Sequence, residues 1–212
     1  IISKIDSLAF KPLVNLEEIF LDHNMIVDLP SDSFLNLNHL DTIHLEYNQI
    51  NIIRTGFIRN IPSLTQLKIS GNNIEHIERE AFSNLSSLQN LDLSSNKLKE
   101  IKDFYFKGLN YLYNLLLNNN GINTIEKHSF DEFSKITRLN LDNNFVFSID
   151  ISIFNNIKIN SLDFSNNRME DFDSSNILSP QNINNLYFSQ NKINVLRKGS
   201  LNIYKYCSTI DF

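Results

Sequence analysis

The feature that most constrains this chain is an apolar phrase that returns at nearly constant spacing. Its first apolar position recurs at Leu16, Leu40, Leu64, Leu88, Leu112, Ile136, Ile159, Ile183 and Cys207. The step from Ile136 to Ile159 is 23 residues, and every other step is 24. A fixed period of roughly 20 to 29 residues is typical of stacked repeats. We therefore expect one elongated solenoid domain over residues 1–212, because each repeat must pack on its neighbours.

The repeat that begins at Leu88 illustrates how one unit should fold. Leu91 and Leu93 flank Asp92, and this alternation predicts a short strand with its leucines turned inward. Asn96 follows where the chain must turn, and its side chain can pair with backbone groups of neighbouring turns. The returning arc then directs four apolar residues to the core: Leu98, Ile101, Phe106 and Leu109.

Two columns keep the same phase along the whole chain. The asparagine column is Asn24, Asn48, Asn72, Asn96, Asn120, Asn144, Asn167 and Asn191. The large apolar column is Phe10, Phe34, Ile58, Phe82, Phe106, Phe130, Phe154, Ile177 and Leu201. Helical apolar spacing would not hold this phase, so a leucine-rich helical protein is excluded.

The pattern LxxLxLxxNxIxxIxxxxFxxL resembles the leucine-rich repeat family over essentially the whole chain. It is similar to the typical subtype of animal secreted and cell-surface proteins, which includes Toll-like receptors and insect immune proteins. The LxGxIP phrase of plant receptors is missing after Asn96 and its counterparts. The resemblance implies an α/β, right-handed horseshoe solenoid, with a concave parallel β-sheet and irregular or short-helical convex arcs.

The register is interrupted at both ends and at two internal places. About eight full repeats lie between partial ones, so we expect a piece of a longer protein with N- and C-terminal caps. The sixth repeat lacks one residue before Ile159, and Pro180 stands in the slot after Ile177. Both changes should disturb the convex arc without breaking the sheet.

The outward strand positions collect most of the negative charge. The chain carries a net charge of −5, which disfavours a general phosphate-binding surface. Only two bases, Lys68 and Arg138, stand among nine acids on or beside these positions: Glu17, Glu18, Asp22, Asp41, Glu46, Asp92, Asp142, Asp163 and Asp211. A basic protein partner is one interpretation. Ordinary solvated strand residues are the other.

Aromatic and charged residues mixed on the early strands predict a binding surface. This candidate patch comprises Glu18, Phe20, Asp22, His23, His44, Glu46 and Tyr47. Phe20 has no packing reason to face solvent, unless a missing cap or a neighbouring chain covers it. Further along the same face, the candidate binding residues are Lys68, Asp92, Leu116, Arg138 and Tyr187.

A second candidate patch combines Tyr113 and Leu116 with Phe145 and Phe147, which follow Asn144 at usually polar positions. An exposed apolar patch of this kind indicates an interface. The alternative is that the irregular loop of the short repeat covers it.

No arrangement of residues indicates catalysis. The sequence has no nucleophile elbow, phosphate loop or paired cysteines, and an open sheet offers no water-excluding cleft for its carboxylates. His23 and His44 lie near Asp22 and Glu46, but no metal-ligand spacing supports a metal site. We therefore expect no enzyme activity and no cofactor. The expected partner is a protein, in a homo- or heterodimer or as a ligand, with no nucleic acid and no membrane insertion by this segment.

Two residues bear on the location of the protein. Asn84 opens the only N-x-[ST] acceptor, on a convex arc where a glycan would leave the sheet clear. Cys207 fills an apolar slot, either as a small buried side chain or as the partner of a cysteine in a cap. We expect a non-enzymatic recognition module of a secreted or cell-surface protein, in immunity, adhesion or signalling. The alternative is an intracellular or bacterial scaffold.

Overall fold

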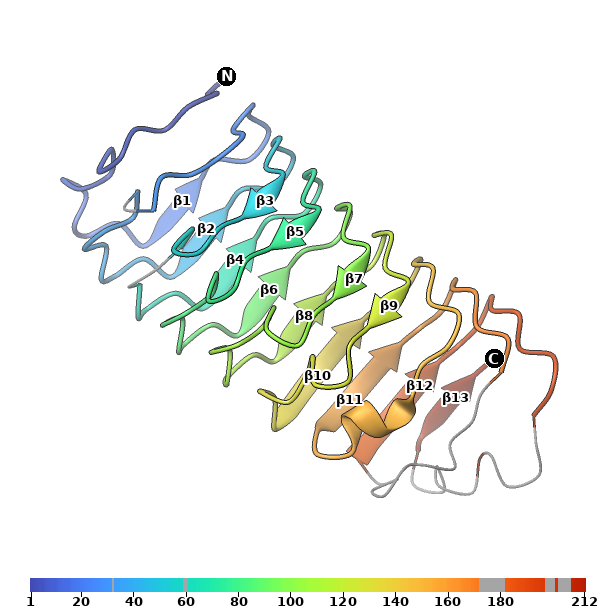
Figure 1. Ribbon diagram of the computed structural model, residues 1–212. Helices are drawn as coiled ribbons and strands as arrows, with labels where there is room; N and C mark the ends of the chain where they lie inside the picture. The colour runs from blue at the N-terminus through green and yellow to red at the C-terminus, as the bar shows by residue number, and fades with distance from the viewer. Residues whose placement is uncertain (32, 59–60, 172–181, 197–200, 202–206) are drawn as a thin grey trace.

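The computed structural model describes residues 1–31, 33–58, 61–171, 182–196, 201 and 207–212. Within them, one nine-stranded parallel sheet runs the length of the molecule, with one strand from each coil (Figure 1). Its strands, in spatial order, are β1 (Glu18–Phe20), β2 (Thr42–His44), β4 (Gln66–Lys68), β6 (Asn90–Asp92), β8 (Asn114–Leu116), β10 (Lys135–Asn140), β11 (Lys158–Asp163), β12 (Ile183–Tyr187) and β13 (Thr209–Asp211). The predicted right-handed solenoid is confirmed.

Strand pairing follows the sequence period residue by residue. Ile19 pairs with Ile43, and Ile43 with Leu67, so each apolar position meets its equivalent in the next coil. Between β10 and β11 the partner of Leu139 is Leu162, one residue earlier than the period would give. The missing residue of the sixth repeat is therefore absorbed outside the sheet, as the sequence predicts.

The arc of that short repeat forms a 3-10 helix, η1 (Ile151–Phe154). Asp150 caps it, since its carboxylate accepts a hydrogen bond from the backbone N–H of Ser152 at 3.0 Å. The second predicted irregularity, at Ile177 and Pro180, lies outside the described residues.

Two further ladders occur on the arcs, where the sequence analysis expected only irregular or short-helical chain. β3 (Ile52–Ile53) pairs with β5 (His76–Ile77), and β7 (Glu100–Ile101) pairs with β9 (Thr124–Ile125) (Figure 1). Isoleucine and threonine favour extended chain, and the coil spacing brings two such dipeptides side by side in each ladder. The remaining described arcs are mostly turns.

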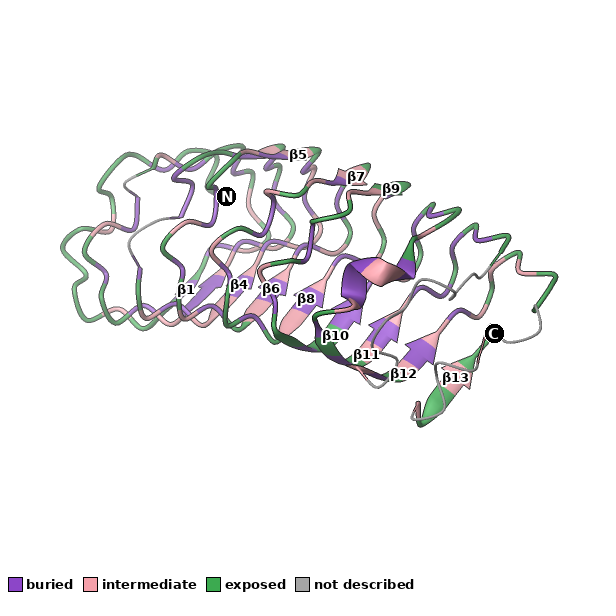
Figure 2. Cartoon of the chain, turned by 60° about the horizontal axis from the view of Figure 1, so that its bottom comes forward, coloured by how far each residue is buried: buried purple, intermediate pink, exposed green. Residues whose placement is uncertain are grey.

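The core lies between the sheet and the arcs. Ile43, Leu67 and Leu91 are at most 1% exposed, and Figure 2 shows buried residues recurring from strand to strand. The aromatic column stacks along the solenoid axis, with ring centroids 6.2 Å apart for Phe106–Phe130 and 5.4 Å for Phe130–Phe154. Apolar burial of this kind stabilises every coil through its two neighbours.

The asparagine column forms the predicted hydrogen-bond ladder. The side-chain amide of Asn72 donates to the carbonyl oxygens of Leu45 (2.9 Å) and Ile69 (3.0 Å). Its Oδ1 accepts from the N–H of Ile50 at 3.0 Å. Asn72 therefore pairs backbone groups of its own coil and of the preceding one. The same pattern recurs at Asn48, Asn96, Asn120, Asn144, Asn167 and Asn191.

The residue before each ladder asparagine takes a left-handed backbone conformation, which the sequence analysis missed. These residues are His23, Tyr47, Gly71, Ser95, Asn119, Asn143, Asn166 and Gln190, with φ between 53° and 68°. Only glycine adopts this conformation freely. The N–H of Tyr47 is held by the carbonyl of Ser70 at 2.9 Å, and that of His23 by the carbonyl of Glu46 at 2.9 Å.

Asn96→Ala should lower the free energy of unfolding by about 1–3 kcal/mol, because it leaves the buried N–H of Ile74 unpaired. The carbonyls of Ile69 and Leu93 each lose one hydrogen bond but keep another, from the side-chain amides of Asn72 and Asn120. Urea denaturation measures the loss. Asn110→Ala, at an exposed position, is the control and should leave the midpoint nearly unchanged. Equal effects from the two substitutions would contradict this account of the ladder.

Gly71→Ala should destabilise the protein by about 1–2 kcal/mol or more, because Gly71 has a left-handed backbone with φ +68°, which alanine adopts only at a cost. A Cβ there would lie 2.6 Å from Cδ1 of Tyr47, so the ring must also move. Gly121→Ala is the matched control, since its Cβ would lie at ordinary contact distance, 3.8 Å from Cγ of Lys99 and 3.4 Å from the carbonyl oxygen of Leu98. The same denaturation experiment compares the two variants, and a larger loss at Gly121 would refute the interpretation.

Candidate binding face

We call the outward side of the nine-stranded sheet the concave face. Strand pairing arranges its side chains in rows, with neighbours about 4.8 Å apart across strands. One row runs through Gln66, Asn90, Asn114 and Arg138, and the next through Lys68, Asp92, Leu116 and Asn140. Because strand partners lie one coil apart, the rows bring together residues that are distant in the sequence.

Three polar residues at outward positions of this face are nevertheless buried: Thr42, Asn140 and Ser165. Thr42 donates its hydroxyl to Asp41 Oδ2 at 3.0 Å, and Asn140 Oδ1 accepts from the N–H of Asp142 at 2.9 Å. Short polar side chains that bond to nearby groups stay close to the sheet, so their outward position does not expose them.

Phe20 does have a neighbour to pack on, contrary to the sequence-based expectation. Its ring stacks on His44 with centroids 4.5 Å apart, while 63% of the residue stays exposed. His23 stacks on Tyr47 at 4.6 Å from the adjacent left-handed turns. The first candidate patch therefore contains two aromatic–imidazole stacks, each joining residues 24 positions apart in the sequence.

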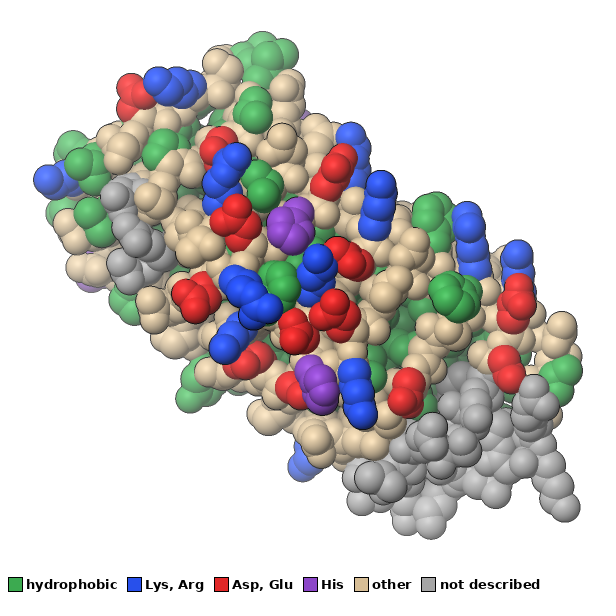
Figure 3. Space-filling view, in the orientation of Figure 1, with side chains coloured by type: hydrophobic (Ala, Val, Ile, Leu, Met, Phe, Trp, Pro, Cys, Tyr) green, Lys and Arg blue, Asp and Glu red, His purple; other side chains and the backbone are tan. Residues whose placement is uncertain are grey.

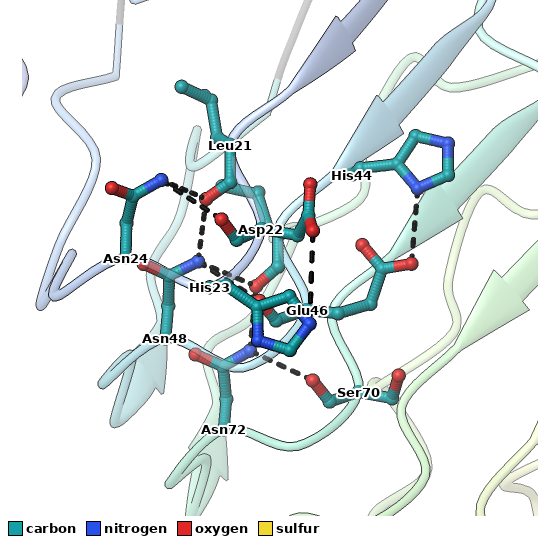
Figure 4. Close-up of polar contacts among 10 residues, drawn as sticks. Leu21, Asp22, His23, Asn24, His44, Glu46, Asn48, Ser70 and Asn72 are labelled. Atoms are coloured by element: carbon teal, nitrogen blue, oxygen red, sulfur yellow. Dashed lines mark hydrogen bonds and ion pairs between the residues drawn. The ribbon is translucent and has the colours of Figure 1, made fainter. Parts of the chain in front are cut away.

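The carboxylates of this patch lie against the imidazoles (Figure 4). His44 Nδ1 is 3.1 Å from Glu46 Oε1, and both side chains are only about 15% exposed. The other oxygen of Glu46 is buried without a hydrogen-bond partner. Asp22 lies 3.9 Å from His23 Nε2, and Glu18 is exposed on β1. Among the residues that the structure describes, no group of three or more His, Cys, Asp or Glu is arranged to hold a metal ion.

A hollow of ≈ 320 Å³ lies at the middle of the concave face, over β4, β6, β8 and β10. Four predicted binding residues line it, namely Lys68, Asp92, Leu116 and Arg138, together with Gln66, Leu67, Asn90, Leu91 and Asn114. Asn114 donates to Asn90 Oδ1 at 2.6 Å across its floor. The sequence predicts each of these four residues as a binding residue, but only the strand register shows that they share one hollow.

The remaining predicted residue, Tyr187, lies apart on β12. It is half-buried, and its strand partners are Asp163 and Asp211. The candidate binding residues of the concave face thus fall into three groups: the stacks near β1 and β2, the central hollow and this C-terminal tyrosine.

The second candidate patch is not one surface. Tyr113 precedes β8, and its carbonyl accepts from Thr137 and Arg138 at the edge where strands begin. Phe145 and Phe147 follow Asn144, beyond the edge where strands end, and both are exposed. The guanidinium of Arg168 covers the Phe145 ring at 4.1 Å. The structure thus places Tyr113 before strand β8 and the two phenylalanines beyond the strand ends, with Leu116 at the end of β8, so it does not bring the four residues together. A binding role for them stays a prediction.

Charged side chains of both signs gather over β3, β5, β7 and β9 (Figure 3). Many are paired: Arg54 with Asp28, Lys102 with Glu100 at 2.9 Å, and Glu78 with the N–H of Thr55 at 2.9 Å. The hydrogen bond from Thr55 lowers the pKa of Glu78, and the hydrogen bond to Glu100 raises the pKa of Lys102. The Arg54 and Glu78 contacts link successive arcs, whereas the Lys102–Glu100 pair lies within one arc.

A buried tyrosine and a half-buried cysteine elsewhere have raised pKa values. Burial raises the pKa of Tyr105, whose hydroxyl lies 3.2 Å from His76 Nδ1. Burial also raises the pKa of the Cys207 thiol, which donates to the carbonyl of Asn184 at 3.0 Å. Cys207 is half-buried and packs against the core from the apolar slot that its spacing predicts. Asn84 is exposed on its arc, with φ 64°.

Solved structures with the same fold come from several kinds of protein. The TLR13 chain of a TLR13–ssRNA13 complex is 25% identical, with a TM-score of 0.87 over 95% of this chain and 29% of that one. Toll, from the Drosophila Toll–Spatzle complex, is 20% identical, with a TM-score of 0.84 over 97% of this chain and 29% of Toll. An internalin from Listeria monocytogenes is 23% identical, with a TM-score of 0.69 over 99% of this chain and 58% of the internalin.

This chain therefore spans less than two thirds of each of those proteins. No curated protein matches it significantly in sequence. No helix within the described ranges has the length and apolar character needed to cross a membrane. A family model described as leucine rich repeat matches residues 1–50, 39–98 and 86–146, well over half of the chain. The chain belongs to the leucine-rich repeat family.

Proposed function

We propose that this chain is a single, non-enzymatic recognition domain that binds a protein partner through its concave face. The observation that carries the proposal is the pair of exposed aromatic–imidazole stacks, Phe20–His44 and His23–Tyr47. Large rings held rigidly by stacking lose little freedom on binding, and aromatic residues dominate the binding energy of many interfaces. Because the Phe20 and Tyr47 rings of these stacks are exposed, contact with a partner would remove their apolar surface from water.

The charge of the face favours a partner that is basic overall. Nine acids against two bases on or beside the outward strand positions create a negative surface. Such a surface speeds the encounter with a basic protein and repels acidic ones. The stacks would supply affinity, and the carboxylates of Glu18, Asp22 and Glu46 would supply selectivity.

A secreted or cell-surface location fits this role, in immune recognition, adhesion or signalling. Support comes from the family subtype and from the likeness to TLR13 and to Toll, the latter in complex with Spatzle. The alternative is a bacterial or intracellular scaffold, for which the internalin shows that the same fold occurs in a bacterial protein. In either setting the partner could be a separate ligand or a second chain in a dimer.

Phe20→Ala and His44→Ala should each weaken binding about five- to thirtyfold, the range of a hot-spot residue. The ligands would be phage-displayed random peptides selected against the 212-residue chain, with affinities measured by biolayer interferometry. Phe147→Ala is the matched control, because Phe147 is equally exposed, at 60%, but lies off the concave face. Melting temperatures should stay within about 2 °C of the parent. Binders that ignore Phe20 and depend on Phe147 would reject the concave face.

Asn84 should carry an N-linked glycan when the chain is secreted from animal cells, because the acceptor asparagine is exposed on an arc. Intact mass spectrometry before and after glycosidase treatment measures the glycan, and Asn84→Gln should abolish it. Peptide binding should be the same with and without the glycan, since Asn84 lies off the sheet. An unmodified secreted chain would remove this support for the extracellular location and favour the scaffold alternative.

A further inference from the structure

The central hollow contains both bases of the concave face, and neither has a partner. Among the described residues, no ion pair or side-chain hydrogen bond involves Lys68 or Arg138. The nearest acid in the lining, Asp92, is turned to Ser94 and accepts from its N–H at 2.9 Å and its hydroxyl at 2.6 Å. The two cations are therefore available to a ligand, although acids predominate on the surrounding face.

The two cations stand at opposite corners of the hollow. Lys68 ends the row that continues through Asp92 and Leu116, whereas Arg138 ends the other row at the far side. Three strand spacings and two residues along a strand separate their Cα atoms by about 16 Å. Both side chains line the same cavity, so a negative group placed inside it is attracted from two sides.

The floor of the hollow selects the rest of the ligand. Leu116 is the leucine whose side chain a ligand can reach in the lining, beside the amides of Gln66, Asn90 and Asn114. Leu67 and Leu91 belong to the core and are at most 1% exposed. A purely ionic ligand would leave Leu116 wet. A segment that carries an acid next to an apolar residue matches both parts, because the apolar residue covers Leu116 while the acid meets the cations.

The charges around the hollow define what flanks that acid. Towards the N-terminus the face carries Glu18, Asp22 and Glu46, and towards the C-terminus Asp142 and Asp163. A polyphosphate chain would meet these carboxylates along its whole length, whereas two cations would neutralise little of it. A peptide with basic residues on both sides of an acidic centre is complementary to every part of this pattern.

The geometry points to the central hollow as a subsite for an acidic residue, with an apolar neighbour, at the centre of an otherwise basic peptide segment of the partner. This inference rests on the proposed function of the concave face and names the chemistry that the face recognises. Lys68 and Arg138 bind the carboxylate, and Leu116 contacts the apolar neighbour.

Three fluorescein-labelled peptides of equal length test it by fluorescence anisotropy on the 212-residue chain. All have basic ends, and their centres are Leu-Glu-Leu, Leu-Gln-Leu and Leu-Lys-Leu. The glutamate peptide should bind about tenfold more tightly than the glutamine peptide, and the lysine peptide most weakly. In the Lys68→Gln/Arg138→Gln variant the preference for glutamate should fall to about twofold or less.

The matched control is Lys107→Gln/Lys127→Gln, which removes the same charge at two exposed positions away from the hollow and should keep the preference. Equal affinity for the glutamate and glutamine peptides overturns the inference, as does a preference that survives loss of Lys68 and Arg138, or no binding of the glutamate peptide up to about 1 mM. If the glutamate and glutamine peptides bind equally well to the parent chain, and Phe20→Ala weakens the binding of both, the proposed function stands without this subsite. A single-stranded RNA oligonucleotide that binds more tightly than the glutamate peptide, through Lys68 and Arg138, would assign the hollow to phosphate.

Discussion

One asparagine in each coil pairs backbone groups of two successive coils, and the solenoid depends on these hydrogen bonds. The turn after each strand passes through the interior, where an unpaired N–H or C=O is costly. Asn72 satisfies Leu45, Ile69 and Ile50 together, which no apolar side chain could do. The bonds also fix the distance from strand to turn in every coil. The strands consequently stay in register even where a coil is one residue short, as between Leu139 and Leu162.

That constraint leaves the outward strand positions free to vary. Their side chains contribute little to the core, so each coil can present a different residue at the same place on a rigid grid. On the concave face this freedom produces stacks at Phe20–His44 and His23–Tyr47, and a hollow between Lys68 and Arg138. The arcs use their freedom differently, because Arg54, Lys102 and Glu78 are all paired with neighbouring groups. The unpaired Lys68 and Arg138 in the hollow and the exposed ring of Phe20 favour the concave face as the binding surface.

The period alone was enough to predict the register, the inward leucines, the asparagine ladder and the break before Ile159, because these depend on equivalent positions meeting across coils. It was not enough for features that depend on which two unlike residues meet. Phe20 was expected to lack a packing neighbour, yet His44, one coil later, supplies the stack. Tyr113 and Phe145 both occupy usually polar positions of the repeat, which predicts a common patch, although the strand between them places them at opposite edges. The sequence does not predict the left-handed turns, because seven of their eight residues are not glycine.

Net charge predicts even less than residue spacing about what a surface binds. Acids outnumber bases at and beside the outward strand positions of the sequence, but a ligand responds to the charged groups within its reach, and screening limits that reach to about 10 Å. The lining of the hollow holds two cations, Lys68 and Arg138, and one carboxylate, Asp92, so its net formal charge is positive. A uniformly basic partner would meet repulsion from Lys68 and Arg138 at this hollow. Selectivity on such a face thus arises from the order of charges along the partner, since each coil contributes one step of a fixed pattern.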